Sequence, residues 1–169
     1  LGQVVPDSPI RETAEYDAAA VLINMQAWDR ASVVLEQFRR DYPGSELADD
    51  VTQKLAVTCM GAGRTAQAAS EFETIAVGAL TTELVRREAL WKASELYGEA
   101  GSLAEEKRVL GDLVARYPEP VSESIEARAR MAEIARDLGD QAERMAILET
   151  LIQVDATAGV QRSDRTRYL

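Results

Sequence analysis

The sequence predicts an all-α protein built from repeated helical hairpins, with eight helices in about four hairpins, and three observations lead to this fold class. Glycine recurs at equal intervals along the chain, at Gly63, Gly101 and Gly139. The segments between these glycines place apolar residues with the period of an α-helix. Aromatic residues make up only 5% of the chain and alanine is abundant, a composition that suits close helix packing better than β-strands.

The three glycines mark the turns inside the hairpins. Each one follows an apolar helical stretch and precedes another, and glycine can take the left-handed conformation that ends a helix without steric cost. The connections between hairpins are marked by proline, which cannot continue a helix interior. Tyr42-Pro43-Gly44-Ser45 and Tyr117-Pro118-Glu119-Pro120 are separated by the length of two repeats.

Apolar stripes define the helices themselves. Ala31, Val34, Leu35 and Phe38 follow the i, i+3, i+4, i+7 spacing of one helix face, and similar clusters recur near Val109 and Ile147. A helix breaker interrupts the pattern after every few turns, which argues against a coiled coil. The helices are expected, in order, over residues 9–25, 28–41, 46–61, 64–77, 81–99, 102–116, 121–138 and 140–154.

Aligned on one another, the units share a common residue pattern. With position 1 at Glu12, Asp49, Arg87 and Ile125, position 8 is always small and positions 24 and 27 are large and apolar. The residues at position 8 are Ala19, Ala56, Ser94 and Ala132. Those at positions 24 and 27, which we expect to form the core, are Leu35, Phe38, Phe72, Ile75, Leu110, Leu113, Leu148 and Leu151.

This pattern resembles the tetratricopeptide repeat (TPR). The resemblance implies a right-handed α-α superhelix of four hairpins, at residues 12–43, 49–80, 87–118 and 125–156. Residues 1–8 are then a linker or a cut end, and residues 157–169 the truncated start of a further repeat. The spacing of the units is slightly longer than in the consensus repeat. Position 20 is alanine in the first two units but Glu106 and Arg144 in the last two, so the first two units lie closer to the consensus.

A shorter resemblance concerns the first connection between hairpins. The segment from Phe38 to Ser45 is similar to the F-x-x-x-Y-P-x-S signature of bacterial envelope TPR proteins, among them the barrel-assembly lipoprotein, the Tol–Pal coordinator and TonB-associated proteins. Arg116-Tyr117-Pro118 matches this signature in part. The resemblance implies a periplasmic location in a bacterium, with a cytoplasmic location as the alternative.

In the family that the chain resembles, the first helix of each hairpin lines a concave groove through positions 2, 5, 9, 12 and 13. Seven of the twenty residues at these positions are acidic and one is basic, and the acid concentrates in the second half, around Trp91. Such a groove suits a basic or polar peptide, although exposed helix positions also favour glutamate as a solvated face. The candidate partner-binding residues are Tyr16, Asn24, Gln53, Met60, Glu88, Trp91, Glu95, Glu99, Glu133 and Arg136.

Charge and composition argue against several other functions. The net charge of −10 would repel a phosphate backbone, and only Arg162, Arg165 and Arg167 form a locally basic stretch, so we expect no nucleic-acid partner. The chain has no histidine and a single cysteine, which removes the commonest general base and zinc ligand. We therefore expect no catalytic, cofactor or metal site. No stretch approaches the roughly 20 apolar residues of a membrane span.

Individual reactive-looking residues are better explained by structure. Cys59 occupies a core-facing position, where a buried thiol acts as a small apolar side chain. The carboxylate pairs Asp49/Asp50 and Glu105/Glu106 point about 100° apart on a helix, so we interpret them as solvated surface and not as acid–base pairs. Trp28 is expected to be a packing residue at the start of the second helix.

The sequence thus predicts a protein-interaction scaffold with no enzymatic activity, forming part of a larger bacterial envelope protein. The alternative is a non-catalytic docking segment of a larger cytoplasmic enzyme or signalling protein. In either case the apolar stacking faces at the two ends of the array favour weak self-association.

Overall fold

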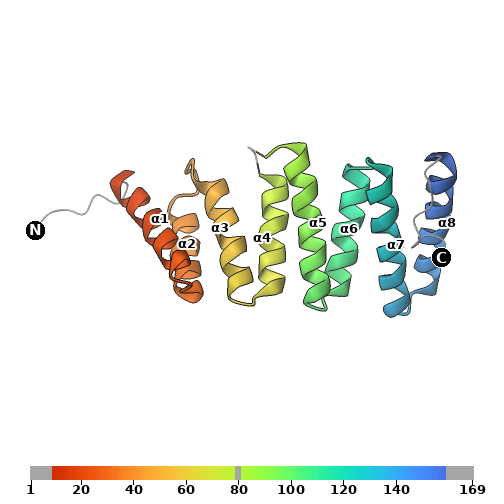
Figure 1. Ribbon diagram of the computed structural model, residues 1–169, viewed down its shortest axis with the longest axis horizontal. Helices are drawn as coiled ribbons and strands as arrows, with labels where there is room; N and C mark the ends of the chain where they lie inside the picture. The colour runs from red at the N-terminus through yellow and green to blue at the C-terminus, as the bar shows by residue number, and fades with distance from the viewer. Residues whose placement is uncertain (1–8, 79–80, 159–169) are drawn as a thin grey trace, which may run out of the picture. The chain divides into compact units, whose positions relative to one another are not determined.

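A computed structural model describes residues 9–78 and 81–158, and within these residues the chain forms eight α-helices and no strand (Figure 1). This confirms the predicted fold class. The predicted linker at 1–8, residues 79–80 and the expected further repeat from residue 159 onward lie outside the described residues. The helices are α1 (Pro9–Asn24), α2 (Trp28–Asp41), α3 (Ala48–Gly61), α4 (Thr65–Val77), α5 (Glu83–Glu99), α6 (Leu103–Arg116), α7 (Val121–Asp137) and α8 (Gln141–Ala158).

The predicted helix bounds agree with those observed to within one turn. The largest difference is at α8, which continues to Ala158, beyond the predicted end of this helix at residue 154. Its first turn is capped by Asp140, whose carboxylate accepts a hydrogen bond of 2.9 Å from the Glu143 backbone N–H. None of the helices in the described part of the chain is both long and apolar enough to span a bilayer.

All four hairpin turns have the same backbone geometry. At the second turn, the Arg64 N–H donates to the Cys59 carbonyl at 2.9 Å and the Gly63 N–H to the Met60 carbonyl at 3.0 Å. These two bonds form a Schellman motif, which satisfies the carbonyl groups left over at a helix end. The turn residue has a positive φ in each hairpin: 71° at Gly63, 72° at Gly101, 80° at Gly139 and 55° at Gln26. The first turn therefore places a glutamine where the other three have glycine.

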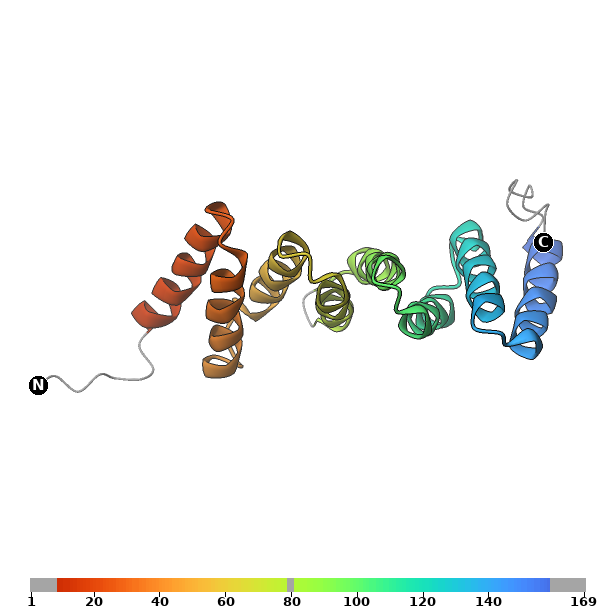
Figure 2. The same cartoon turned by 90° about the horizontal axis from the view of Figure 1, so that it is seen from below.

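The chain divides into two compact units, with the boundary between Thr82 and Glu83. The N-terminal unit contains α1 to α4 and the C-terminal unit α5 to α8. Within each unit every helix packs against the next one along the chain, as expected for a repeat array in which each element contacts its sequence neighbours (Figure 2).

The core of each unit comes from the apolar stripes. In the N-terminal unit Leu35, Phe38, Val51 and Leu55 are buried together, and the Phe38 ring packs on the Tyr42 ring with 4.9 Å between centroids. In the C-terminal unit α7 and α8 share a buried cluster that includes Ile125 and Leu151. Six of the eight predicted core residues are buried, whereas Phe72 and Leu148 are half-buried.

Cys59 and Trp28 have the packing roles that were predicted. Cys59 is buried in α3, and burial raises the pKa of its thiol, which disfavours the reactive thiolate. Trp28 begins α2 and its indole lies against the backbone of Gly61, so closely that a Cβ added there would come within 2.6 Å of the ring. A glycine at the end of α3 thus makes room for the tryptophan that starts α2.

Candidate functional site

An open cavity of about 380 Å³ lies between α5 and α7 in the C-terminal unit, with Trp91 in its wall. On α5, Glu88 precedes Trp91 by three positions and Glu95 follows it by four, so the helical period brings all three side chains to one face. The residues that line the cavity are Arg87, Glu88, Trp91, Lys92, Glu95, Glu123 and Glu126.

Glu123 and Glu95 in this wall each pair with a basic residue of the same wall. Glu123 pairs with Arg87, whose Nε lies 3.2 Å from the carboxylate, and Glu95 pairs with Lys92 at 2.9 Å. Glu88 is exposed and makes no hydrogen bond or ion pair with any residue in the described part of the chain. The cavity therefore has more negative than positive charge beside a large aromatic side chain.

A second cavity of about 210 Å³ adjoins the first one. The two share Trp91, Glu95 and Glu126 in their linings. The second is also lined by Glu106 and Leu110 from α6 and by Arg130 from α7.

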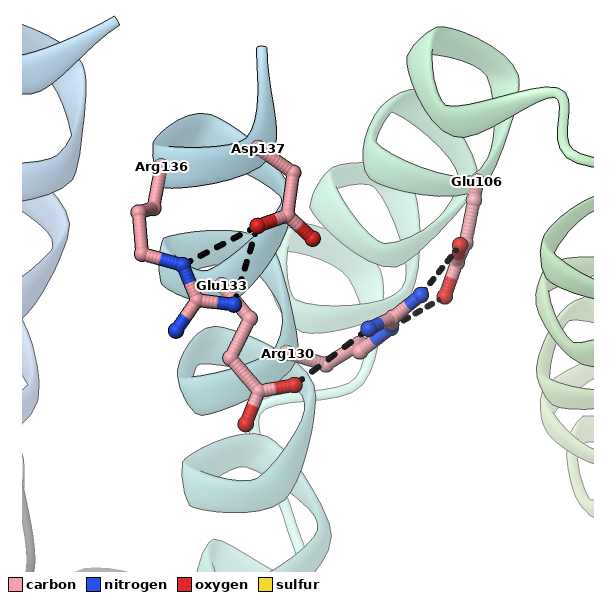
Figure 3. A network of polar contacts seen from close by, with 5 residues as sticks. All are labelled: Glu106, Arg130, Glu133, Arg136 and Asp137. Atoms are coloured by element: carbon pink, nitrogen blue, oxygen red, sulfur yellow. Dashed lines mark hydrogen bonds and ion pairs between the residues drawn. The ribbon is translucent and has the colours of Figure 1, made fainter. Parts of the chain in front are cut away.

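Glu106 and Arg130 form a bidentate ion pair between α6 and α7, shown in Figure 3. The Arg130 Nε donates to Glu106 Oε1 at 2.6 Å, and its terminal nitrogen to Oε2 at 2.9 Å. Glu106 is only 4% exposed, so our interpretation of Glu105/Glu106 as solvated surface is wrong for Glu106. The hydrogen bonds to Glu106 raise the pKa of Arg130 above its already high ordinary value, which keeps the guanidinium charged.

Gly98 on α5 makes the burial of Glu106 possible. A Cβ at this position would lie 2.9 Å from the Glu106 Oε2 atom and 3.0 Å from its carboxyl carbon. Real Cβ atoms almost never come so close to other heavy atoms, so a side chain at position 98 would displace the carboxylate. The glutamate that departs from the consensus at position 20 is thus accommodated by a glycine on the neighbouring helix.

The remaining predicted groove residues of this unit lie farther along α5 and α7. Glu133 accepts a hydrogen bond of 3.3 Å from Arg130, and the Arg136 terminal nitrogen lies 2.9 Å from the Asp137 carboxylate (Figure 3). Glu99 is exposed in the last turn of α5. These three predicted residues do not line the cavity at Trp91.

In the N-terminal unit the predicted residues have different surroundings. The Tyr16 hydroxyl donates a hydrogen bond to the Asp50 carboxylate, which raises the pKa of the tyrosine. Gln53 lines a separate cavity of about 150 Å³ between α3 and α4. Asn24 and Met60 are exposed near the hairpin turns.

Three of the ten predicted groove residues, Glu88, Trp91 and Glu95, are therefore brought together at one cavity. Sequence reasoning missed Arg87, Lys92 and Glu123 in the wall of this cavity. It considered only the five helix positions that line the groove in the resembled family, and these three residues lie next to those positions. Glu106 and Arg130 were missed as well. The signal for Glu106 was present, since a charge replaces alanine at position 20 in that unit.

One family model matches two segments of the chain. Residues 13–45 and 88–120 match the family model described as the tetratricopeptide repeat. These ranges correspond to the first and third units. The first and third units share the Tyr-Pro pair, Tyr42-Pro43 and Tyr117-Pro118, which the second lacks. No curated protein shows a significant match to the chain.

Solved structures with similar folds include two that are described as TPR-like repeats. A variant of the nearly identical TPR-like repeats of a kinesin light chain-like protein from Podosopora anserina aligns with 90% of this chain and 78% of that one, at a TM-score of 0.52 and 18% identity. Another structure of those repeats covers 95% and 82% of the two chains, at a TM-score of 0.50 and 16% identity. MamA from Desulfovibrio magneticus RS-1, from residue 41 to its end, covers 92% and 80% at a TM-score of 0.47 and 12% identity.

Proposed function

We propose that this chain is a protein-interaction scaffold whose C-terminal unit receives a segment of a partner protein in the cavity at Trp91. Its fold is TPR-like, and TPR arrays are generally non-catalytic scaffolds that bind proteins through surfaces built by stacked hairpins. The proposal places that general function at a particular surface, formed by the first helices of two successive hairpins, α5 and α7.

One observation carries the proposal. The cavity of about 380 Å³ is open, and it combines a half-buried tryptophan with several charged side chains. Tryptophan is enriched among the residues that dominate binding energy at protein interfaces, above all where it is partly enclosed. Charged groups around such an anchor direct the approach of a partner and fix its orientation.

A peptide-display selection against the chain tests this proposal. Selected peptides should lose about tenfold or more in affinity for a Trp91→Ala variant, because an anchoring tryptophan contributes roughly 1.4 kcal/mol or more. Leu84→Ala is the matched control, since Leu84 is exposed on the same helix but does not line the cavity. Peptides that bind the parent and the Trp91→Ala variant equally well would contradict the proposed site.

We further propose that the partner segment is basic. The support is the excess of carboxylates over basic groups around the cavity and the net charge of −10 of the whole chain. Attraction between opposite charges at an exposed surface is screened by salt, so the association rate with such a segment should fall as the ionic strength rises. A rate that does not change with salt would argue for an uncharged partner.

A bacterial envelope location is also a proposal, and it is supported by the residues from Phe38 to Ser45. In the structure these residues form the end of α2 and the connection to α3, where the Ser45 hydroxyl accepts a hydrogen bond of 3.0 Å from the Leu47 N–H and contacts the Glu12 carboxylate. Fractionation of cells that express the full-length protein tests the location. Recovery in the periplasmic fraction is the expected result, and recovery with cytoplasmic proteins would favour the alternative of a cytoplasmic docking segment.

A further inference from the structure

The two units have the same three kinds of side chain at equivalent positions, two hairpins apart in the sequence. An aromatic residue on the first helix of a hairpin, Tyr16 or Trp91, faces an acidic and a basic residue on the first helix of the next hairpin. In the N-terminal unit these are Asp50 and Lys54 on α3. In the C-terminal unit the equivalent residues are Glu126 and Arg130 on α7.

In the N-terminal unit the chain supplies its own cation to the aromatic ring. The Lys54 ammonium lies 5.1 Å from the centroid of the Tyr16 ring and 3.4 Å from the Asp50 carboxylate. Cation and ring attract because the face of an aromatic ring carries partial negative charge, and the carboxylate adds a direct charge–charge attraction. The aromatic side chain, the acid and the base therefore complement one another within the unit.

In the C-terminal unit the equivalent cation is held elsewhere. Arg130 is bound by the buried Glu106 carboxylate in two hydrogen bonds, and the position equivalent to Glu106 in the N-terminal unit is Ala31, which cannot hold a cation. Among the described residues no basic group lies over the Trp91 ring. Trp91 thus remains beside Glu88 and Glu126, without the internal cation that its counterpart Tyr16 has.

We propose that the cavity at Trp91 binds the charged end of one lysine or arginine side chain of the partner, which takes the place that Lys54 occupies at Tyr16. This proposal rests on the proposed function and adds the chemistry of recognition to it. Glu106 acts as a positioning residue, because it withdraws Arg130 from the ring and so keeps the site open.

The other basic groups of the cavity do not compete for this place. Arg87 is paired with Glu123 and Lys92 with Glu95, while the exposed Glu88 has no partner among the described residues. An incoming cation therefore meets a tryptophan, which attracts cations best among the aromatic side chains, and the exposed Glu88 carboxylate, whose charge it offsets. Arginine should bind more tightly than lysine, since its planar guanidinium can stack on the indole and reach a carboxylate at the same time.

The chain has two tryptophans, which gives the test an internal reference. The probes are three acetylated and amidated pentapeptides, Gly-Ser-X-Ser-Gly, with arginine, lysine or glutamine as X, titrated into the isotopically labelled protein. The indole N–H signal of Trp91 should shift with the arginine and lysine peptides and stay in place with the glutamine peptide, while the signal of Trp28 in the N-terminal unit stays in place throughout. Equal shifts with the glutamine peptide, or equal shifts at both tryptophans, would overturn the proposal.

A pair of variants tests the role assigned to Glu106. Glu106→Ala introduces the residue found at the equivalent position 31, frees Arg130 to approach Trp91, and should weaken arginine-peptide binding by about tenfold. Glu106→Ala combined with Arg130→Ala removes the competing cation and should restore the affinity. Unchanged binding in the single variant, or equally weak binding in the double variant when circular dichroism shows both to be folded, would overturn the role.

Failure of this inference can be distinguished from failure of the proposed function. Peptides from the display selection that depend on Trp91 but tolerate glutamine in place of each of their basic residues would leave the scaffold site standing and overturn the cation site. Peptides that are indifferent to Trp91→Ala would overturn both. Peptides that lose affinity both for Trp91→Ala and when their basic residues are replaced by glutamine support the scaffold site and the cation site.

Discussion

Gln26 shows how a single residue can depart from its repeat while the backbone keeps the same geometry. Its φ of 55° lies in the left-handed region, and its N–H donates to the Ile23 carbonyl at 2.8 Å in the same motif that uses glycine in the other three hairpins. A side chain in this conformation brings Cβ close to the backbone, at a cost of roughly 1–2 kcal/mol. The first hairpin keeps the shared turn despite this cost.

Gln26→Gly should therefore stabilise the protein. Relief of the left-handed strain exceeds the added freedom of glycine in the unfolded chain, and the net gain in the free energy of unfolding should be about 0.5–1 kcal/mol. Urea denaturation followed by circular dichroism measures it. As a control, Gln37→Gly at an exposed helical position of α2 should lower the free energy of unfolding by about 1 kcal/mol, and a loss of stability in both variants would contradict the argument.

Two helical glycines of the C-terminal unit should respond oppositely to alanine. Gly98→Ala places a Cβ 2.9 Å from the Glu106 carboxylate and should lower the free energy of unfolding by about 1–3 kcal/mol. At Gly111, in the middle of α6, the nearest atom would be the Met131 Cε at 3.7 Å, an ordinary contact, so Gly111→Ala should raise the free energy of unfolding by about 0.5–1 kcal/mol. Thermal denaturation of the two variants side by side decides between this account and a uniform preference of helices for alanine.

Sequence reasoning at this scale succeeded where a residue type has one dominant structural use. The glycines at three turns, the buried Cys59 and the packing role of Trp28 all followed from local chemistry. It failed at Gln26 and Glu106, because each depends on a neighbour that no local pattern reveals. Gln26 is held left-handed by the hairpin that it closes, and Glu106 is buried by means of a glycine on another helix and an arginine on a third.

At the scale of helices, the Glu106–Arg130 pair links α6 to α7, and its two members should differ in their effect on stability. Arg130→Ala leaves a carboxylate that is 4% exposed without a cation, and breaking a buried pair in this way costs about 3–5 kcal/mol. Glu106→Ala leaves a partly exposed arginine whose charge water can solvate, so its cost should be about 1–2 kcal/mol. Chemical denaturation of both variants checks the order, and the reverse order would show that Glu106 is reached by solvent.

The helices were predictable in number, order and approximate bounds, because apolar periodicity and turn residues are local signals. Their pairing was predictable in part, since neighbours in sequence become neighbours in space in such arrays. The candidate site was harder to predict than the helices. The helical period predicted that Glu88, Trp91 and Glu95 share one face of α5. The opposite wall of the cavity depends on how α7 packs, and the residue pattern of a single helix does not determine that packing.

For the whole molecule, the division at Thr82 and Glu83 leads to a prediction about folding. Each unit has its own buried cluster, around Phe38 in one and Ile125 in the other, and the stability of a repeat array is approximately a sum over repeats and their nearest-neighbour interfaces. Fragments 1–82 and 83–169 should therefore each remain helical when produced separately. Their summed far-ultraviolet circular dichroism should equal that of the intact chain.

The separate fragments also locate the proposed binding activity. All residues that line the cavity at Trp91 belong to the C-terminal unit, so fragment 83–169 should bind the arginine pentapeptide with the affinity of the intact chain. Fragment 1–82 should not bind it, because Lys54 already lies over Tyr16 there. A Lys54→Ala variant of fragment 1–82 makes the comparison sharper, since removing this internal cation should create weak binding at Tyr16. If that variant stays inactive while fragment 83–169 binds, the two arrangements are not equivalent and the larger indole surface of Trp91 is itself required.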